Sequence, residues 1–172
     1  MPLWPLPKKC HISRYFTREA GADMLQHGSC AASGGAGVLF LGVPGSGKSD
    51  LLLRLMQRGW QLVADDQVAL SAQGEAVLAE APAELAGMLE VRGIGIFQSL
   101  PHGPAELRLA VLLVGREDVP RLPEPRVFTV LGRDLPLLAL HAFECSAPAK
   151  IELALGVAEA RYALHAGALS AA

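Results

Sequence analysis

A glycine-rich loop between two apolar segments constrains the fold of this chain more than any other feature of its sequence. The loop has the pattern Gly-x-x-x-x-Gly-Lys-Ser over residues 42–49. The continuous apolar run of residues 38–41 precedes it and is typical of a buried strand, whereas leucines with helical spacing follow it over residues 51–55. Strand, glycine-rich loop and helix in this order predict an α/β domain with a phosphate-binding loop of the Walker A type.

Each residue type in this loop has a physical role in binding phosphate. The glycines allow backbone N–H groups to close around phosphate oxygens. Lys48 brings a positive charge to the terminal phosphates, and the Ser49 hydroxyl can bind Mg²⁺. The predicted nucleotide-binding residues are therefore Gly42, Val43, Pro44, Gly45, Ser46, Gly47, Lys48 and Ser49.

Two adjacent carboxylates follow the next predicted strand. Residues 61–64 form a short apolar run that ends in Asp65 and Asp66. A right-handed parallel β-α-β crossover would place the end of that strand on the same sheet edge as the phosphate-binding loop. Carboxylates beside a triphosphate can bind a metal ion, accept a proton, or do one of each. We therefore expect the pair to face the nucleotide rather than to form an acidic turn in solvent.

The rest of the chain predicts one strand-rich domain. Residues 1–22 contain several prolines and are expected to form a loosely ordered lead-in, and residues 23–172 a single P-loop catalytic domain. Strands are expected at residues 24–33, 93–97, 107–114, 127–130 and 135–138, with a hairpin of 68–71 and 76–79 around Gln73-Gly74. Helices are expected at 51–58, capped by Gly59, at 82–89 and at 149–165.

Composition and charge exclude several classes of protein. The chain has 172 residues, of which 51% are hydrophobic, and a formal net charge of −2. This balance leaves no excess of basic residues for binding nucleic acid or an acidic membrane surface. The apolar runs are much shorter than the ~18–20 residues that span a bilayer. The first residues place lysines after the apolar positions, the reverse of a signal peptide.

The cysteines indicate a reducing compartment. Cys10, Cys30 and Cys145 are odd in number and have no C-x-x-C spacing, so neither a disulfide framework nor a zinc site is predicted. We expect each to be a small, buried apolar residue with a reduced thiol, in a cytoplasmic protein.

Three segments together resemble the catalytic domain of HPr kinase/phosphorylase, a bacterial family that acts on a serine of the phosphocarrier protein HPr. The segments are residues 42–50, residues 58–68 (Arg-Gly-Trp-Gln-Leu-Val-Ala-Asp-Asp-Gln-Val) and residues 90–96 (Glu-Val-Arg-Gly-Ile-Gly-Ile). The last two distinguish this family from other P-loop kinases. The resemblance runs from about His27 to Lys150. It looks like the short form found in some proteobacteria, with a mixed-sheet core of the HPr kinase and PEP carboxykinase type.

The resemblance implies roles for individual residues. Asp66 matches the catalytic aspartate that accepts the proton of the HPr serine, and His27 matches the histidine that assists it. Lys48 matches the phosphate-binding lysine, and Arg121 the catalytic arginine. We assign Asp65 an electrostatic or metal-related role, because neighbouring carboxylates cannot both ionise freely without a cation.

The resemblance also implies cofactors and a partner. Ser49 and Glu90 match Mg²⁺ ligands, and ATP would be the phosphate donor, with phosphate and pyrophosphate acting in a reverse phosphorolysis. An HPr-type protein would be the substrate. Whether the chain forms a homo-oligomer is left open. The chain departs from the family at Pro44, where serine is usual. It also departs over residues 146–150, which lack the Gly-Arg-Asn that the long enzymes place in a loop important for dephosphorylation.

Two other functions fit the same loop. A small-metabolite kinase would carry a mobile arginine-rich lid, but the arginines after residue 100 are dispersed along the chain. A non-catalytic ATP-sensing module would use Asp65 and Asp66 only to bind Mg²⁺. In that case, loss of Asp66 would leave signalling intact, whereas a kinase would lose phosphate transfer and retain nucleotide binding.

Overall fold

Strand β3 (Ala36–Leu41) lies at the centre of the fold, and all of its residues are buried. The computed structural model describes residues 24–170. In it β3 pairs in parallel with β9 (Ala105–Leu113) and antiparallel with β2 (Ser29–Ser33). Val38 and Phe40 face one apolar cluster, and Leu39 and Leu41 face another. Burial on both faces explains why this strand is a continuous apolar run rather than an alternating one.

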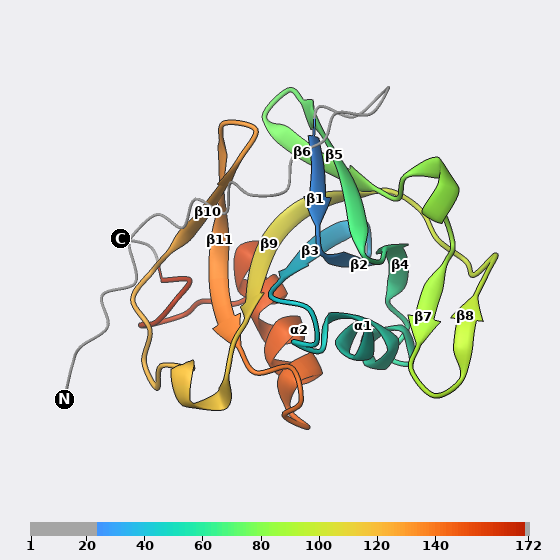
Figure 1. The fold of residues 1–172 in the computed structure, drawn as a ribbon. Coiled ribbons are helices and arrows are strands. Elements are labelled where there is room, and N and C mark those ends of the chain that lie inside the picture. Colours follow the sequence, from blue (N-terminus) through green and yellow to red (C-terminus); the bar gives the residue numbers. More distant parts are fainter. Residues whose placement is uncertain (1–23, 171–172) are drawn as a thin grey trace.

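Two helices cover one face of the sheet (Figure 1). Helix α1 (Lys48–Met56) follows the glycine-rich loop, and α2 (Ala147–Ala158) follows the last strand. Leucines of α1 and the buried Ile151 and Leu155 of α2 pack against the helix-facing side chains of β3 and β9. This cluster fixes α1 against the strand that leads into its own N-terminus.

On the other face the sheet itself curves round (Figure 1). Its strands enclose a second cluster of buried apolar side chains there. The nine-stranded sheet has the order β1-β5-β6-β9-β3-β2-β4, and β11 pairs with β9 and with β10. The long strand β9 pairs with β6 at its start and with β11 at its end. The remaining strands are β1 (Met24–His27), β4 (Gln61–Ala64), β5 (Gln67–Gln73), β6 (Ala76–Glu80), β10 (Val127–Val130) and β11 (Arg133–Leu140).

A separate two-stranded hairpin extends beside α1. It consists of β7 (Leu89–Val91) and β8 (Gly95–Phe97). Short 3-10 turns, η1 (Ala83–Leu85) and η2 (Arg116–Asp118), lie in the connections on either side of β7, β8 and β9. Among residues 24–170, no helix is long and apolar enough to cross a membrane.

The mixed α/β fold and most of its predicted strands are confirmed. Strands β3 and β4 are both antiparallel to β2, so they run in the same direction, as the crossover predicts. They are not neighbours, however, because β2 lies between them. Their carboxyl ends still meet at one edge of the sheet. The predicted lead-in of residues 1–22, with Cys10, lies outside the described residues, and the division into lead-in and single domain stays a prediction.

The helix predicted over residues 82–89 is wrong. Only η1 forms there, because Gly87 has a left-handed φ of 70° that no helix continues through. A Cβ at Gly87 would lie 2.9 Å from the Leu100 carbonyl oxygen, so the position requires glycine. The chain then turns into β7, in which Leu89 is buried in the core.

The C-terminal helix is shorter than the predicted span of 149–165. Helix α2 begins at Ala147, with a proline in its first turn, and ends at Ala158. Ala160 has a left-handed φ of 57°, and the N–H of Tyr162 donates to the Gly156 carbonyl oxygen at 3.1 Å. The Tyr162 ring lies against Gly156, where a Cβ would come within 2.3 Å of it. The chain therefore folds back on the helix instead of continuing it.

Smaller differences concern turns and a cysteine. Helix α1 ends at Met56 rather than at residue 58, and the hairpin turn lies at Gly74-Glu75. Cys30 is fully buried, as expected, but Cys145 is exposed, which corrects the expectation of a buried apolar residue there. Cys145 lies in the connection between β11 and α2 rather than in a strand or helix.

The two described cysteines should differ in reactivity. The Cys30 side chain is 0% exposed. This burial raises the pKa of the Cys30 thiol, which suppresses the reactive thiolate. Iodoacetamide should therefore modify Cys145 in the folded protein and reach Cys30 only after unfolding. Peptide mass spectrometry with and without urea measures this directly. Equal labelling of both thiols without urea would contradict the buried position of β2.

Candidate active site

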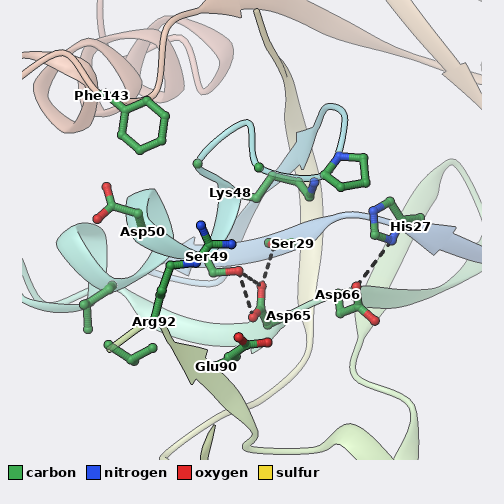
Figure 2. Close-up of a pocket in the computed structure, with 15 residues that line it drawn as sticks. His27, Ser29, Lys48, Ser49, Asp50, Asp65, Asp66, Glu90, Arg92 and Phe143 are labelled. Carbon is green, nitrogen blue, oxygen red and sulfur yellow. Dashed lines mark hydrogen bonds and ion pairs between the residues drawn. The ribbon is translucent and has the colours of Figure 1, made fainter. Parts of the chain in front are cut away.

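A cavity of about 550 Å³ opens at the sheet edge where β3 and β4 end. Its walls come from the glycine-rich loop, α1, the ends of β1 and β4, β7 and the connection after β11 (Figure 2). The structure thus brings together most of the predicted site residues. The lining residues are His27, Ser29, Pro44, Gly45, Gly47, Lys48, Ser49, Asp50, Leu53, Asp65, Asp66, Glu90, Val91, Arg92 and Phe143.

Two glycines allow the phosphate-binding loop to close tightly. Gly47 precedes α1 with a left-handed φ of 93°, and a Cβ there would lie 2.7 Å from the Ala142 Cβ. A Cβ at Gly42 would lie 2.6 Å from the Ser46 Oγ. The loop therefore turns directly into α1, whose first backbone N–H groups have no partners within the helix.

Lys48 reaches back along the loop. Its Nζ donates to the carbonyl oxygens of Gly42 at 2.9 Å and Val43 at 3.2 Å. Burial lowers the pKa of Lys48, and the negative charges of Asp65 and Asp66 oppose that shift. The ammonium is therefore fixed at the loop, beside two carboxylates and without a direct ion pair to either of them.

Asp65 is the buried carboxylate of the site. Its Oδ1 accepts hydrogen bonds from Ser29 Oγ at 2.6 Å and from Ser49 Oγ at 2.9 Å, and its Oδ2 lies 3.0 Å from Ser49 Oγ. Ser29 is fully buried on β2, and Ser49 lies in the first turn of α1. These contacts provide the donors that a buried carboxylate requires. Sequence reasoning missed Ser29, whose one signal is a polar residue opening a buried strand.

Asp66 points elsewhere, although it is the next residue (Figure 2). Its φ is 68°, and the N–H of Gln67 donates to the Asp65 carbonyl oxygen across it at 2.8 Å. Its carboxylate is 69% exposed, and its Oδ1 lies 3.5 Å from His27 Nδ1, an ion pair when the imidazole is protonated. The left-handed turn thus separates the two carboxylates, one buried on serines and one open to the cavity.

The β7–β8 hairpin contributes Glu90 and Arg92. Both line the cavity, and the Arg92 side chain extends toward Ser49 (Figure 2). Arg92 was not assigned a role from the sequence, although it lies in the segment that carries the resemblance. Arg121 is exposed on the segment between η2 and β10 and is not among the lining residues. Its catalytic role stays a prediction.

The donor set fits a phosphate ligand with Mg²⁺. The buried Ser46 Oγ has no hydrogen-bond partner in the described part of the chain, so the loop holds an unsatisfied donor. Within residues 24–170, no three His, Cys, Asp or Glu side chains are placed to hold a metal by themselves. Mg²⁺ typically takes one or two protein oxygens and completes its shell with water and phosphate oxygens. The residues present therefore suit Mg²⁺ that arrives with a polyphosphate.

Removal of the Ser29 hydroxyl should destabilise the fold. Ser29→Ala leaves Asp65 with one donor fewer in a buried position, and the expected loss in free energy of unfolding is about 1.5–3 kcal/mol. Urea denaturation measures it. Ser33→Ala on the same strand is the matched control, since the Ser33 hydroxyl bonds to no other described residue. Equal stability of the two variants would refute the hydrogen bond between β2 and Asp65.

Comparisons with known proteins agree with the geometry. The family model described as HPr serine kinase C-terminal domain matches residues 19–101. HPr kinase/phosphorylase of Cupriavidus metallidurans is 34% identical over 142 residues, which are 76% of this chain and 44% of that protein. The protein of the same name from Lactiplantibacillus plantarum is 49% identical over 87 residues, 50% of this chain and 28% of that one. The chain thus spans less than half the length of these relatives.

A solved structure extends the likeness to most of the chain. The Hpr(Ser) kinase/phosphatase from Coxiella burnetii superposes with a TM-score of 0.69 at 28% identity, covering 80% of this chain and 91% of that chain. The segment matched by the family model contains the phosphate-binding loop, both aspartates and Glu90. Sequence, fold and cavity therefore agree that this chain is similar to the HPr serine kinase C-terminal domain.

Proposed function

We propose that this chain is an ATP- and Mg²⁺-dependent kinase that phosphorylates a serine of an HPr-type phosphocarrier protein. One observation carries the proposal. The adjacent carboxylates are divided between two environments, so that Asp65 is buried on Ser29 and Ser49 while Asp66 opens to the cavity beside His27. One carboxylate is therefore suited to the metal side of the site, and the other is available as a base.

Asp66 would act as the general base. A serine hydroxyl is a weak nucleophile at neutral pH, so a carboxylate must accept its proton as the oxygen attacks the γ-phosphate. The new bond joins the serine Oγ to the γ-phosphorus, the bond to the β-phosphate oxygen breaks, and ADP leaves. The Nδ1 of His27 lies 3.5 Å from the Asp66 Oδ1. His27 would therefore orient that carboxylate and interact with its negative charge.

The phosphate side of the site would rely on the loop and its cations. Lys48 Nζ, fixed by the carbonyls of Gly42 and Val43, lies where a terminal phosphate would meet the loop. Arg92 adds a second positive charge on the cavity wall. These charges would stabilise the transferring phosphoryl group without rearrangement at the moment of reaction.

Three residues would hold Mg²⁺. Ser49 donates its proton to Asp65, which leaves the oxygen lone pairs of its hydroxyl available to the ion. Asp65 and Glu90 supply carboxylate oxygens from two different elements of the cavity wall. When bound, the ion neutralises charge that develops on the phosphate oxygens.

The similarity to HPr kinase/phosphorylase supports a proposal for the wider biological role. We propose an HPr-type protein as partner, a cytoplasmic location, and regulation of a phosphotransferase system. Reverse phosphorolysis of phosphoserine to pyrophosphate would use the same pocket, because pyrophosphate resembles the β,γ-phosphates of ATP. The segment that lacks Gly-Arg-Asn is not a loop here, since residues 147–150 form the first turn of α2. We therefore assign this chain the kinase direction first.

Phosphate transfer from labelled ATP tests the proposal. With Mg²⁺ and an HPr-type protein as acceptor, wild type should label the acceptor serine, and a Ser→Ala acceptor should stay unlabelled. Asp66→Asn should lower kcat roughly 100- to 10,000-fold while ATP binding is retained, because asparagine tolerates the left-handed φ. Asp134→Asn, an exposed aspartate on β11, serves as the matched control.

Other outcomes would favour other functions. Tight ATP binding with no labelling of the acceptor would contradict the kinase and support a sensing module. Transfer to a small metabolite in place of the protein would support the small-metabolite kinase. Equal rates for wild type and Asp66→Asn would remove Asp66 as the base.

A further inference from the structure

An exposed aromatic ring lines the cavity, and the proposed phosphate transfer assigns no role to it. Phe143 lies in the connection between β11 and α2, lines the cavity and is 57% exposed. In Figure 2 it lies on the opposite side of the phosphate-binding loop from His27 and Asp66. An exposed aromatic ring at the wall of a cavity is available for contact with a ligand that enters it.

The connection that carries Phe143 is held in place on α1. Arg54 donates to the carbonyl oxygens of Ala142 and Glu144, which flank the phenylalanine. The His141 ring meets the Phe143 ring edge-on, with centroids 5.7 Å apart. The ring is therefore presented by a fixed backbone rather than by a loop without contacts, which lowers the entropy cost of binding to it.

The same connection packs directly on the phosphate-binding loop. A Cβ at Gly47 would lie 2.9 Å from the Phe143 Cζ, so the ring lies against the loop residue that directly precedes α1. A nucleotide whose phosphates lie along this loop has its terminal phosphate toward Asp66, and its base must leave at the other end. Among the described residues that line the cavity, Phe143 is the one Phe, Tyr or Trp, and the other ring, the His27 imidazole, lies on the Asp66 side.

We propose that Phe143 is the stacking platform for the base of a nucleoside triphosphate. This rests on the proposed function, since it requires that the loop binds the phosphates. The ring face offers dispersion and π contact to any planar base, and such stacking on one aromatic side chain strengthens binding measurably. The position of the ring on the side away from Asp66 favours this ligand over the acceptor protein.

Binding of ATP and of tripolyphosphate separates the base from the phosphates. Isothermal titration calorimetry in Mg²⁺ should show that Phe143→Ala weakens ATP binding about 10-fold and changes tripolyphosphate binding by less than about 2-fold. Phe143→Tyr should restore ATP binding, because it keeps the ring. Phe97→Ala, at a 41% exposed phenylalanine of β8 outside the cavity, should change neither affinity.

The outcomes distinguish the two claims. Unchanged ATP binding in Phe143→Ala would overturn the stacking role and leave the phosphate site intact. Equal weakening for ATP and tripolyphosphate would also overturn it, since the ring would then support only the loop. Failure of wild type to bind either ligand would overturn the nucleotide site itself, and the stacking role with it.

Discussion

The buried carboxylate of Asp65 is the interaction on which the rest of the site depends. A carboxylate removed from water is costly unless donors surround it, and here the donors come from Ser29 on β2 and Ser49 on α1. The end of β4 is therefore locked to both elements. Ser49 in turn fixes the first turn of the helix that the phosphate-binding loop enters. One hydrogen-bonded carboxylate thus sets the relative position of strand, loop and helix.

The orientation of Asp65 also decides what Asp66 can do. Because Asp65 turns inward, the left-handed turn at the next residue directs Asp66 outward to the cavity and to His27. Two carboxylates that would repel each other in one place instead take separate places with separate partners. The sheet topology contributes as well, since β2 lies between β3 and β4 and brings a buried serine to the carboxylate. The proposed division between metal side and base follows from this geometry.

Local sequence patterns predicted the parts of the site that local chemistry determines. The glycine-rich loop, the strand before it and the helix after it all appear, and Asp65 and Asp66 reach the expected sheet edge. Ser29, Arg92 and Phe143 were missed because long-range packing brings them to the cavity from β2, the β7–β8 hairpin and the connection after β11. The predicted helices at residues 82–89 and 149–165 were wrong or too long for a related reason. Left-handed residues and tertiary contacts stop the chain where apolar spacing alone predicts continuation.

A crystal structure with Mg²⁺ and a non-hydrolysable ATP analogue tests the central claim most directly. The claim is that Asp65 belongs to the metal side of a nucleotide site while Asp66 stays open to the acceptor. It predicts phosphates on the backbone of residues 43–49, Mg²⁺ on Ser49, and Asp66 facing the γ-phosphate without binding the metal. Phosphates bound away from the loop, or Asp66 as the metal ligand with Asp65 remote from the ion, would contradict it.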